Sequence, residues 1–428
     1  MIRVISRSRQ NCEHLLNEFM TEDHFDLVID DNTDFYEHGI SQDENTLGFR
    51  FRKNIFSKDE MAGAYEGLAE AAVISNNRGT STGTIGLHKQ GLRDWVYPWQ
   101  TEIMKLATSG SSLMSSDKTP EQIMTEYENK YGSLDYHWDK RGVLWHRARI
   151  AAAGYEYENF FLSQLPLTPE KVEEMRTFIT TTAYTAGIHS GIAGFYDRYP
   201  RIPFGRATNY TEKNMQKFKK CYPYMRTLNN LFAELVPGRY AKQKSVAEKI
   251  DERFIVAEDT AFSTITVNKN YRTTAHRDGA NLEGGFSNLS TVTKGGVGWE
   301  GGLFVLPEFR VAINLRPGDA LLVDNAGIIH GNTEIIPPAG MDIEDMERVS
   351  LVSYMRDGMV ELKSKEYEDA RYDYVMERSR NKDHKLWRDR WNGVSPGMWE
   401  EEEWLEFLTA RGLEDEDGLT GSSGVLPI

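Results

Sequence analysis

The pattern of short β-rich segments predicts an α+β protein whose core is a double-stranded β-helix, or jelly roll. These segments follow one another closely after residue 250, and glycine, proline and asparagine separate them, as is typical of sandwiches and jelly rolls. Helix-start signals before them and a charged, tryptophan-rich stretch after them predict flanking helices. The expected strands are 253–257, 262–267, 302–306, 310–315, 319–324 and 347–355.

Helix-start signals recur along the first half of the chain. Ser57-Lys-Asp-Glu60 is a capping box, and Thr119-Pro120 and Thr168-Pro169 each combine a threonine cap with proline in the first turn. A fourth helical pattern is expected in two pieces, because Pro223 interrupts it and Pro237-Gly238 ends it. The expected helices are 57–72, 119–132, 168–183 and 211–235, and the glycine- and threonine-rich residues 78–92 are expected to form a loop.

We expect three parts along the chain. Residues 1–165 form an N-terminal accessory region of helical and irregular character, residues 166–360 form the jelly-roll core, and residues 361–428 form a charged, Trp-rich helical tail. The length of 428 residues is compatible with this division, since domains average roughly 150 residues each.

Composition excludes several classes of protein. With 50 basic and 65 acidic side chains the net charge is −15, which excludes a wholly basic nucleic-acid coat protein. A content of 39% hydrophobic and 11% aromatic residues can bury a core, so global disorder is also excluded. Two cysteines, Cys12 and Cys221, are too few for a disulfide framework or a cysteine-based zinc site.

No targeting or membrane signal is visible in the sequence. The first ten residues are polar and basic and lack the apolar run of a signal peptide. No window approaches the roughly 18 apolar residues of a membrane span. We therefore expect a cytoplasmic protein without a membrane partner, located in the host cytoplasm if a phage encodes it; the sequence leaves the oligomeric state open.

The negative charge is concentrated at the two ends of the chain. Residues 1–60 hold 13 acidic and 7 basic side chains, and residues 401–428 hold 8 acidic and 1 basic. Residues 201–249 instead hold 11 basic and 3 acidic side chains. This basic segment, which includes Lys219 and Lys220, is the candidate for phosphate contacts, and solvated helix faces are the alternative interpretation.

One group of residues predicts metal chemistry. His276 and Asp278 are two residues apart in TTAHRDGAN, so on a strand their side chains share one face. His330 follows the β-rich segment 319–324. Two histidines and one carboxylate are the facial triad of non-haem Fe(II) oxygenases, which leaves three coordination positions open.

An arginine completes the predicted site. Arg348 opens the β-rich segment after His330, and its fork suits two-point pairing with the distal carboxylate of a 2-oxoglutarate co-substrate. Ser350 is two residues further on and shares the face of Arg348, so its hydroxyl can add a donor.

Five segments carry a family resemblance: GFYDRYPRIPFGRATNY (194–210), FSTITVNKNYRTTAHRDGAN (262–281), GGLFVLPEF (301–309), PGDALLVDNAGIIHGN (317–332) and RVSLVSYMR (348–356). In this order the set resembles the TET and J-binding-protein (TET/JBP) Fe(II)/2-oxoglutarate dioxygenases, which oxidise 5-methyl groups of pyrimidine bases in nucleic acid. The resemblance covers about residues 188–356. No cysteine-rich zinc-binding insert precedes it, so the chain is more similar to phage, protist or algal members than to animal ones.

The resemblance implies a role for each matching residue. In the family the triad holds iron, an arginine and a hydroxyl bind 2-oxoglutarate with a second arginine nearby, an asparagine contacts the target base, and an aromatic ring stacks on it. These positions are His276, Asp278 and His330 for iron, Arg348, Ser350 and Arg206 for the co-substrate, and Asn281 and Tyr354 for the base. The implied cofactors and co-substrates are Fe(II), 2-oxoglutarate and O2, with ascorbate as a reductant.

Simpler roles stay open for three of these residues. Asn281 can cap a turn, Tyr354 can belong to the core, and Arg206 can be one more member of the basic segment.

Three hypotheses about function follow. The first is a dioxygenase that hydroxylates the 5-methyl group of a pyrimidine in DNA, with 5-methylcytosine converted to 5-hydroxymethylcytosine favoured and thymine next. The second is the same chemistry on a protein side chain or a small metabolite, and the net charge of −15 favours it mildly. The third is a binding module without turnover, which a complete triad together with a co-substrate arginine argues against.

Overall fold

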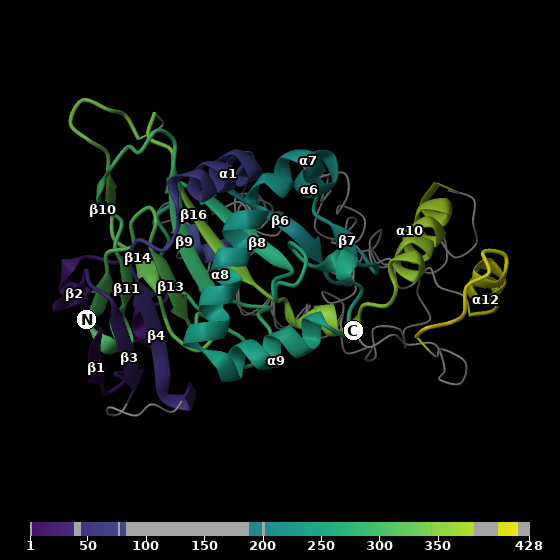
Figure 1. The fold of residues 1–428 in the computed structure, drawn as a ribbon, viewed down its shortest axis with the longest axis horizontal. Helices are drawn as coiled ribbons and strands as arrows, with labels where there is room; N and C mark the ends of the chain where they lie inside the picture. The colour runs from purple at the N-terminus through teal and green to yellow at the C-terminus, as the bar shows by residue number, and fades with distance from the viewer. Residues whose placement is uncertain are drawn as a thin grey trace, which may run out of the picture. The chain divides into compact units, whose positions relative to one another are not determined.

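The computed structural model describes residues 2–37, 44–75, 78–82, 188–198, 202–343, 345–380 and 401–417 (Figure 1). The chain divides into two compact units, of which the first comprises Met1–Gly83, Gly187–Tyr199 and Phe204–Tyr372 and the second Thr84–Ala186, Pro200–Pro203 and Asp373–Ile428. All the described strands belong to the first unit. The architecture is mixed α+β with more than one sheet, in line with the predicted class.

A ten-stranded sheet forms the largest element of the first unit (Figure 1). Its centre is antiparallel, with β16 between β9 and β8, whereas β1 joins β3 in parallel. In order across the sheet the strands are β1 (Arg3–Arg7), β3 (Thr33–Glu37), β4 (Leu47–Arg52), β13 (Ala320–Val323), β9 (Ser287–Thr293), β16 (Arg348–Tyr354), β8 (Thr264–Lys269), β6 (Ile188–Tyr196) and β5 (Ile74–Ser75), and β7 (Arg206–Ala207) pairs with β6.

A smaller sheet packs against one face of the large one. An apolar cluster lies between them, with Leu321 and Phe49 from the large sheet and Phe304 and Val311 from the small one. The smaller sheet contains β14 (Gly331–Asn332), β11 (Phe304–Leu306), β12 (Val311–Ile313) and β2 (Leu27–Ile29), and β10 (Glu300–Gly301) pairs with β15 (Ile335–Ile336) in a separate ladder.

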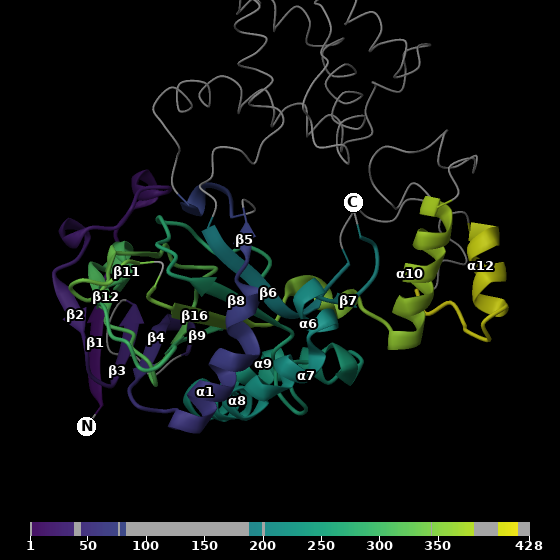
Figure 2. The same ribbon diagram turned by 90° about the horizontal axis from the view of Figure 1, so that it is seen from above.

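Helices cover the opposite face of the large sheet, as Figure 2 shows for α1, α8 and α9. Val349 and Leu351 of β16 belong to the apolar cluster that includes these helices, and Ser350 and Val352 point the other way because side chains alternate along a strand. The helices of the described chain are α1 (Lys58–Leu68), α6 (Asn209–Lys213), α7 (Met215–Phe218), α8 (Tyr222–Leu235), α9 (Pro237–Ala247), α10 (Lys365–Arg380) and α12 (Glu401–Thr409).

The capping box at the start of α1 is confirmed. The amide of Glu60 donates to Ser57 Oγ at 3.2 Å, and the amide of Ser57 donates to Glu60 Oε2 at 2.8 Å. These two bonds satisfy amides that the first turn of a helix leaves without a partner.

Helix α8 ends at Leu235, as predicted from Pro237-Gly238, but Pro237 also begins a further helix, α9, which was not predicted; proline is well tolerated in a first turn. Two other predictions around the basic segment were wrong. Residues 253–257 are not a strand: a 3-10 helix spans Glu252–Phe254, and Asp251 caps it by accepting from the amide of Arg253 at 3.0 Å. The break in helix 211–235 was predicted at Pro223, but helix α8 begins at Tyr222 and carries this proline in its first turn.

The predicted helical or irregular character of the N-terminal region was also wrong for the part that the structure describes. Residues 3–75 contain five strands, three of which join the large sheet beside β13. The alternation of apolar and polar residues in these strands is obscured in the sequence, because β3 and β4 bury polar groups in pairs. Arg52 and Asp34 are one such pair, with Nη1 and Oδ1 2.8 Å apart. A buried polar group is tolerated when it is paired, and such a pair hides the apolar pattern of a strand.

Some predictions lie outside the described residues. These are most of the loop 78–92, the helices 119–132 and 168–183, and the domain boundary at 165/166. Among the residues that the structure does describe, no helix has the length and apolar character needed to cross a membrane.

Truncating Phe49 should test whether the N-terminal strands stabilise the core. Phe49 is fully buried in β4 and its ring stacks on Phe35 with centroids 5.0 Å apart. We expect Phe49→Ala to lower the free energy of unfolding by about 3–5 kcal/mol, measured by urea denaturation. Val4→Ala is the control, because Val4 is 44% exposed, and it should change stability by less than about 0.5 kcal/mol. Equal effects of the two substitutions would contradict a core role for β4.

Candidate metal centre

The two histidines are brought together by a short backbone bridge. His276 and Asp278 lie in the segment between β8 and β9, outside any regular strand, so the strand geometry assumed from their spacing was wrong. Instead, the amide of each histidine donates to the carbonyl of the other, with both N–O distances at 2.9 Å. This antiparallel pairing places His276 beside His330 although 54 positions separate them in the sequence.

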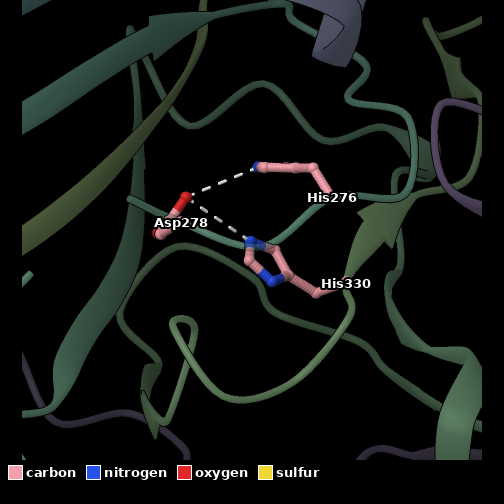
Figure 3. A group of neighbouring side chains, drawn as sticks. All are labelled: His276, Asp278 and His330. Atoms are coloured by element: carbon pink, nitrogen blue, oxygen red, sulfur yellow. Dashed lines mark ion pairs between the residues drawn. The ribbon is translucent and has the colours of Figure 1, made fainter. Parts of the chain in front are cut away.

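The three side chains converge on one point (Figure 3). Asp278 Oδ1 lies 3.5 Å from His276 Nε2 and 3.8 Å from His330 Nε2. One ligand atom of each residue falls within 4.8 Å of the others. Two imidazole nitrogens and one carboxylate oxygen at these separations fit a single first-row metal ion, with positions left open for further ligands.

Hydrogen bonds on the far side of each ligand fix its orientation. His276 Nδ1 donates to the carbonyl of Thr274 at 2.7 Å, and His330 Nδ1 donates to the carbonyl of Ile328 at 3.0 Å. With Nδ1 protonated, the lone pair of each neutral ring lies on Nε2, which faces the metal position. Asn325 donates to the other oxygen of Asp278 at 3.1 Å.

The electrostatics of the group suit metal binding. Burial, together with the charge of His276, lowers the pKa of His330 to about 4. Burial alone would raise the pKa of Asp278, but the hydrogen bond from His276 and the nearby His330 hold it below its ordinary value. Burial disfavours charge on His276 as well, yet the hydrogen bond that its protonated ring donates to Asp278 raises its pKa. Near neutral pH, Asp278 is therefore ionised and His330 neutral, the forms that bind a metal.

Arg348 is a buried cation without a carboxylate partner among the described residues. It is 3% exposed, and its Nε has no hydrogen-bond acceptor there. Burial and the charge of Arg316 lower the pKa of Arg348 to about 10, so it stays protonated near neutral pH. Its guanidinium lies 5.2 Å from the ring centroid of Trp299, which holds it in place. A buried charge needs a counter-ion, so this position fits the carboxylate of a small acid.

A pocket of about 450 Å³ contains most of the predicted residues. Its wall includes the triad together with Arg348, Ser350, Asn281 and Tyr354. Arg206 is not part of the wall: its guanidinium stacks at 4.8 Å on the ring of Tyr196, which does line the pocket. The structure thus brings seven of the eight predicted residues to one cavity, and Arg206 is the one that does not line it.

Other wall residues were not predicted from the sequence. Tyr196 and Tyr271 add aromatic rings, and Arg356 stacks on Tyr196 at 4.7 Å while its Nε donates to Asp197 Oδ1 at 2.7 Å. Asn325 orients Asp278 from the NAGII stretch before His330. No local spacing rule identifies these residues, because the sheet brings them to the pocket from separate strands and loops.

Most of the predicted basic segment lies away from the pocket. Lys217 and Lys220 form ion pairs with Glu70 and Glu66, next to helix α1 on the face of the sheet that is opposite the pocket. Besides Arg206, helix α9 of this segment comes near the site: Arg239 Nη1 lies 3.5 Å from Asp324 Oδ2, and Lys242 lies against Gly284. Residues 281–287 and 324–327 line a second hollow of about 270 Å³, which shares Asn281 and Asn325 with the pocket.

Comparison with known proteins gives a family match for this part of the chain. Residues 191–357 match the Tet_JBP family model, described as the oxygenase domain of the 2OGFeDO superfamily. This range contains the metal triad, Arg348 and the pocket strands β8, β9 and β16.

Curated relatives are similar over the same region. The bifunctional helicase and thymine dioxygenase JBP2 of Trypanosoma brucei brucei is 33% identical over 174 residues, which are 40% of this chain and 15% of that protein. The thymine dioxygenase JBP1-B of Trypanosoma cruzi is 30% identical over 170 residues, 39% of this chain and 19% of that protein. The chain thus matches about a fifth or less of each relative's length. Among solved structures, NgTET1 in complex with 5mC DNA is 15% identical, covers 48% of this chain and 77% of its own, and has a TM-score of 0.33.

Replacing Arg348 by lysine should weaken binding of 2-oxoglutarate. The substitution keeps a positive charge but removes the planar fork that pairs with a carboxylate at two points. We expect about a tenfold rise in the dissociation constant, equivalent to roughly 1.4 kcal/mol, measured by calorimetric titration of the metal-loaded protein. Arg310→Lys is the control, since Arg310 pairs with Asp26 at the surface. Unchanged affinity in Arg348→Lys would show that the co-substrate carboxylate binds elsewhere.

Proposed function

We propose that this protein, whose residues 191–357 are a TET/JBP oxygenase domain, is an Fe(II)- and 2-oxoglutarate-dependent dioxygenase that hydroxylates the 5-methyl group of a pyrimidine base in DNA. The observation that carries the proposal is the convergence on one pocket of the triad and the buried Arg348, which has no carboxylate partner in the described part of the chain. A metal site next to a buried cation suits a co-substrate that chelates iron at one end and carries a carboxylate at the other.

We also propose that the two facing sheets form the double-stranded β-helix expected from the sequence. The triad supports this assignment, because two of its members come from the loop after β8 and His330 directly precedes β14 of the smaller sheet. The proposal leaves β1, β3 and β4 as additions to the large sheet beside β13.

In the proposed reaction the residues of the chain bind the metal ion and orient the co-substrate. His276, Asp278 and His330 would hold the iron, which with 2-oxoglutarate and O2 supplies the oxidising chemistry when bound. The Nδ1 hydrogen bonds to Thr274 and Ile328 keep the two rings in the metal-binding tautomer. Arg348 would fix the distal carboxylate, with Ser350 on the same pocket wall as a further donor. Ascorbate stays the proposed reductant for maintaining Fe(II).

The pocket suits a base that has left the double helix. Its volume of about 450 Å³ lies within the usual range for small-ligand sites. A methyl group that stays inside duplex DNA cannot reach a metal held within this pocket. We propose that Tyr354 stacks on the flipped base and that Asn281 contacts its edge. Asn281 Nδ2 donates to Ser287 Oγ at 2.9 Å, which leaves its carbonyl oxygen to accept from the base.

Two bases are candidates, with 5-methylcytosine first and thymine next. Two named relatives are thymine dioxygenases, so thymine must be tested on an equal footing. The same chemistry on a protein side chain or a small metabolite is the alternative. The acidic net charge of −15 favours it, because it opposes binding to nucleic acid.

Turnover of modified DNA tests the proposal directly. Purified protein is incubated with Fe(II), 2-oxoglutarate, ascorbate and DNA containing either 5-methylcytosine or thymine, and the nucleosides are analysed by mass spectrometry. We expect a hydroxymethyl product that is absent with His276→Ala, since that variant loses a metal ligand. Succinate formed on another substrate, with no product on either DNA, would favour the alternative. A protein that binds no iron would contradict both functions.

Charge reversals should locate the DNA-binding surface. The sequence placed Lys219 and Lys220 in the candidate segment for phosphate contacts, but Lys220 pairs with Glu66 on the face opposite the pocket. We therefore expect the double variant Lys219→Glu/Lys220→Glu to bind DNA as the wild type does. Lys242→Glu with Lys244→Glu is an equal change of charge on α9, where Lys242 lies against Gly284 of the second hollow, and it should weaken binding several-fold and reduce its salt dependence. Fluorescence anisotropy at several salt concentrations measures DNA binding by both double variants. A larger loss in Lys219→Glu/Lys220→Glu than in Lys242→Glu/Lys244→Glu would place the phosphate contacts around Lys219 and Lys220.

A further inference from the structure

One buried carboxylate touches both chain segments that carry the metal ligands. Glu308 lies in a 3-10 helix, Pro307–Phe309, and is 3% exposed. It contacts Arg277, which stands between His276 and Asp278 in the sequence, and Ile329, which directly precedes His330. None of the roles assigned above uses this residue.

The contacts of Glu308 use both of its carboxylate oxygens. Oε2 accepts from the amide of Ile329 at 2.7 Å, and Oε1 accepts from Arg277 NH2 at 3.3 Å. Arg9 NH1 lies 3.9 Å from Oε1, and Arg277 also reaches Glu13 Oε1 at 2.8 Å. The charge is therefore balanced by arginines, as a buried carboxylate requires.

Each contact restrains one ligand segment. The bond to the amide of Ile329 fixes the peptide that leads into His330, whose own amide makes the bridge to His276. The ion pair with Glu308 restrains Arg277, and with it the loop in which His276 and Asp278 flank this arginine. One rigid side chain thus joins the two segments whose separation sets the distances between the three ligands.

We propose that Glu308 is a positioning residue that holds the two ligand segments in register and thereby raises the affinity of the site for its metal ion. It touches neither the metal position nor the pocket and acts through Arg277 and the Ile329 amide. The inference rests on the iron site of the proposed function, but not on the identity of the substrate.

The chain offers a matched control for a purely structural role. Glu368 is also fully buried and forms an ion pair with Arg198, and it also accepts backbone hydrogen bonds, from Gly205 at 2.6 Å and Lys363 at 3.0 Å. It has no contact with the ligand segments among its described bonds. Glu308→Gln and Glu368→Gln therefore remove the same charge from similar environments, and only the first is next to the metal centre.

Metal titration of the full chain tests the inference. Co(II) replaces Fe(II), because its visible absorption reports both affinity and ligand geometry, and thermal unfolding of the metal-free variants measures stability. We expect Glu308→Gln to weaken Co(II) binding by about 10–100-fold, the usual effect of removing a residue that orients metal ligands, and to change the absorption spectrum. Glu368→Gln should lower the unfolding temperature but bind Co(II) with wild-type affinity and spectrum.

A second variant covers the case in which Glu308→Gln does not fold. Arg277→Gln removes the ion pair with Glu308 but keeps the bond to the Ile329 amide, and should weaken Co(II) binding by a smaller factor. Wild-type affinity and spectrum in the folded variants, or an equal loss in Glu368→Gln, would overturn the role of Glu308. Absence of Co(II) binding by the wild-type protein would instead contradict the iron site itself.

Discussion

The pair of backbone hydrogen bonds between His276 and His330 is the constraint on which the site depends. Each histidine sits outside a regular strand, so no sheet ladder sets its position. The bridge fixes the separation of the two rings, and the carbonyls of Thr274 and Ile328 fix their tautomers. Asp278 then needs only to reach the gap between two nitrogens that are already in place. This order explains why the supporting hydrogen bonds come from the backbone, whose positions are the least variable.

The pairing of buried charges separates structural from functional cations. Arg52 is neutralised by Asp34, Arg356 by Asp197 and Arg198 by Glu368. A buried charge that lacks such a partner is costly, and proteins retain it where a ligand supplies the counter-charge. Arg348 is in this situation, within the part of the chain that is described, and it faces the same cavity as the triad. The charge of Arg348, without a carboxylate partner in the described part of the chain, is therefore stronger support for an acidic co-substrate than the position of this residue in strand β16.

The sequence predicted which residues meet at the candidate site better than the geometry that brings them together. The triad and Arg348 could be singled out because metal and carboxylate binding demand these residue types. The location of His276 could not be predicted in this way, because the bridge that replaces the strand joins residues far apart in the chain. Arg206 shows the same limit: the family resemblance assigns it to the co-substrate, but it stacks on Tyr196 and is not part of the pocket wall. The N-terminal strands escaped notice because buried pairs such as Arg52 and Asp34 interrupt their apolar alternation.

The net charge of a sequence segment does not give the charge of the surface that it forms. The basic segment 201–249 lies between acidic ends in the chain, yet the fold places Lys217 and Lys220 against Glu70 and Glu66 near α1. Neutralised pairs contribute little to the attraction of a polyanion, because their fields cancel within about a Debye length, about 8 Å at physiological salt. Under the proposed function, attraction to DNA then depends on cations near the site, such as Lys242 on α9, which lies against Gly284 of the second hollow. If this chain of net charge −15 acts on DNA as proposed, its selectivity should come from the base pocket and little of it from the phosphate backbone.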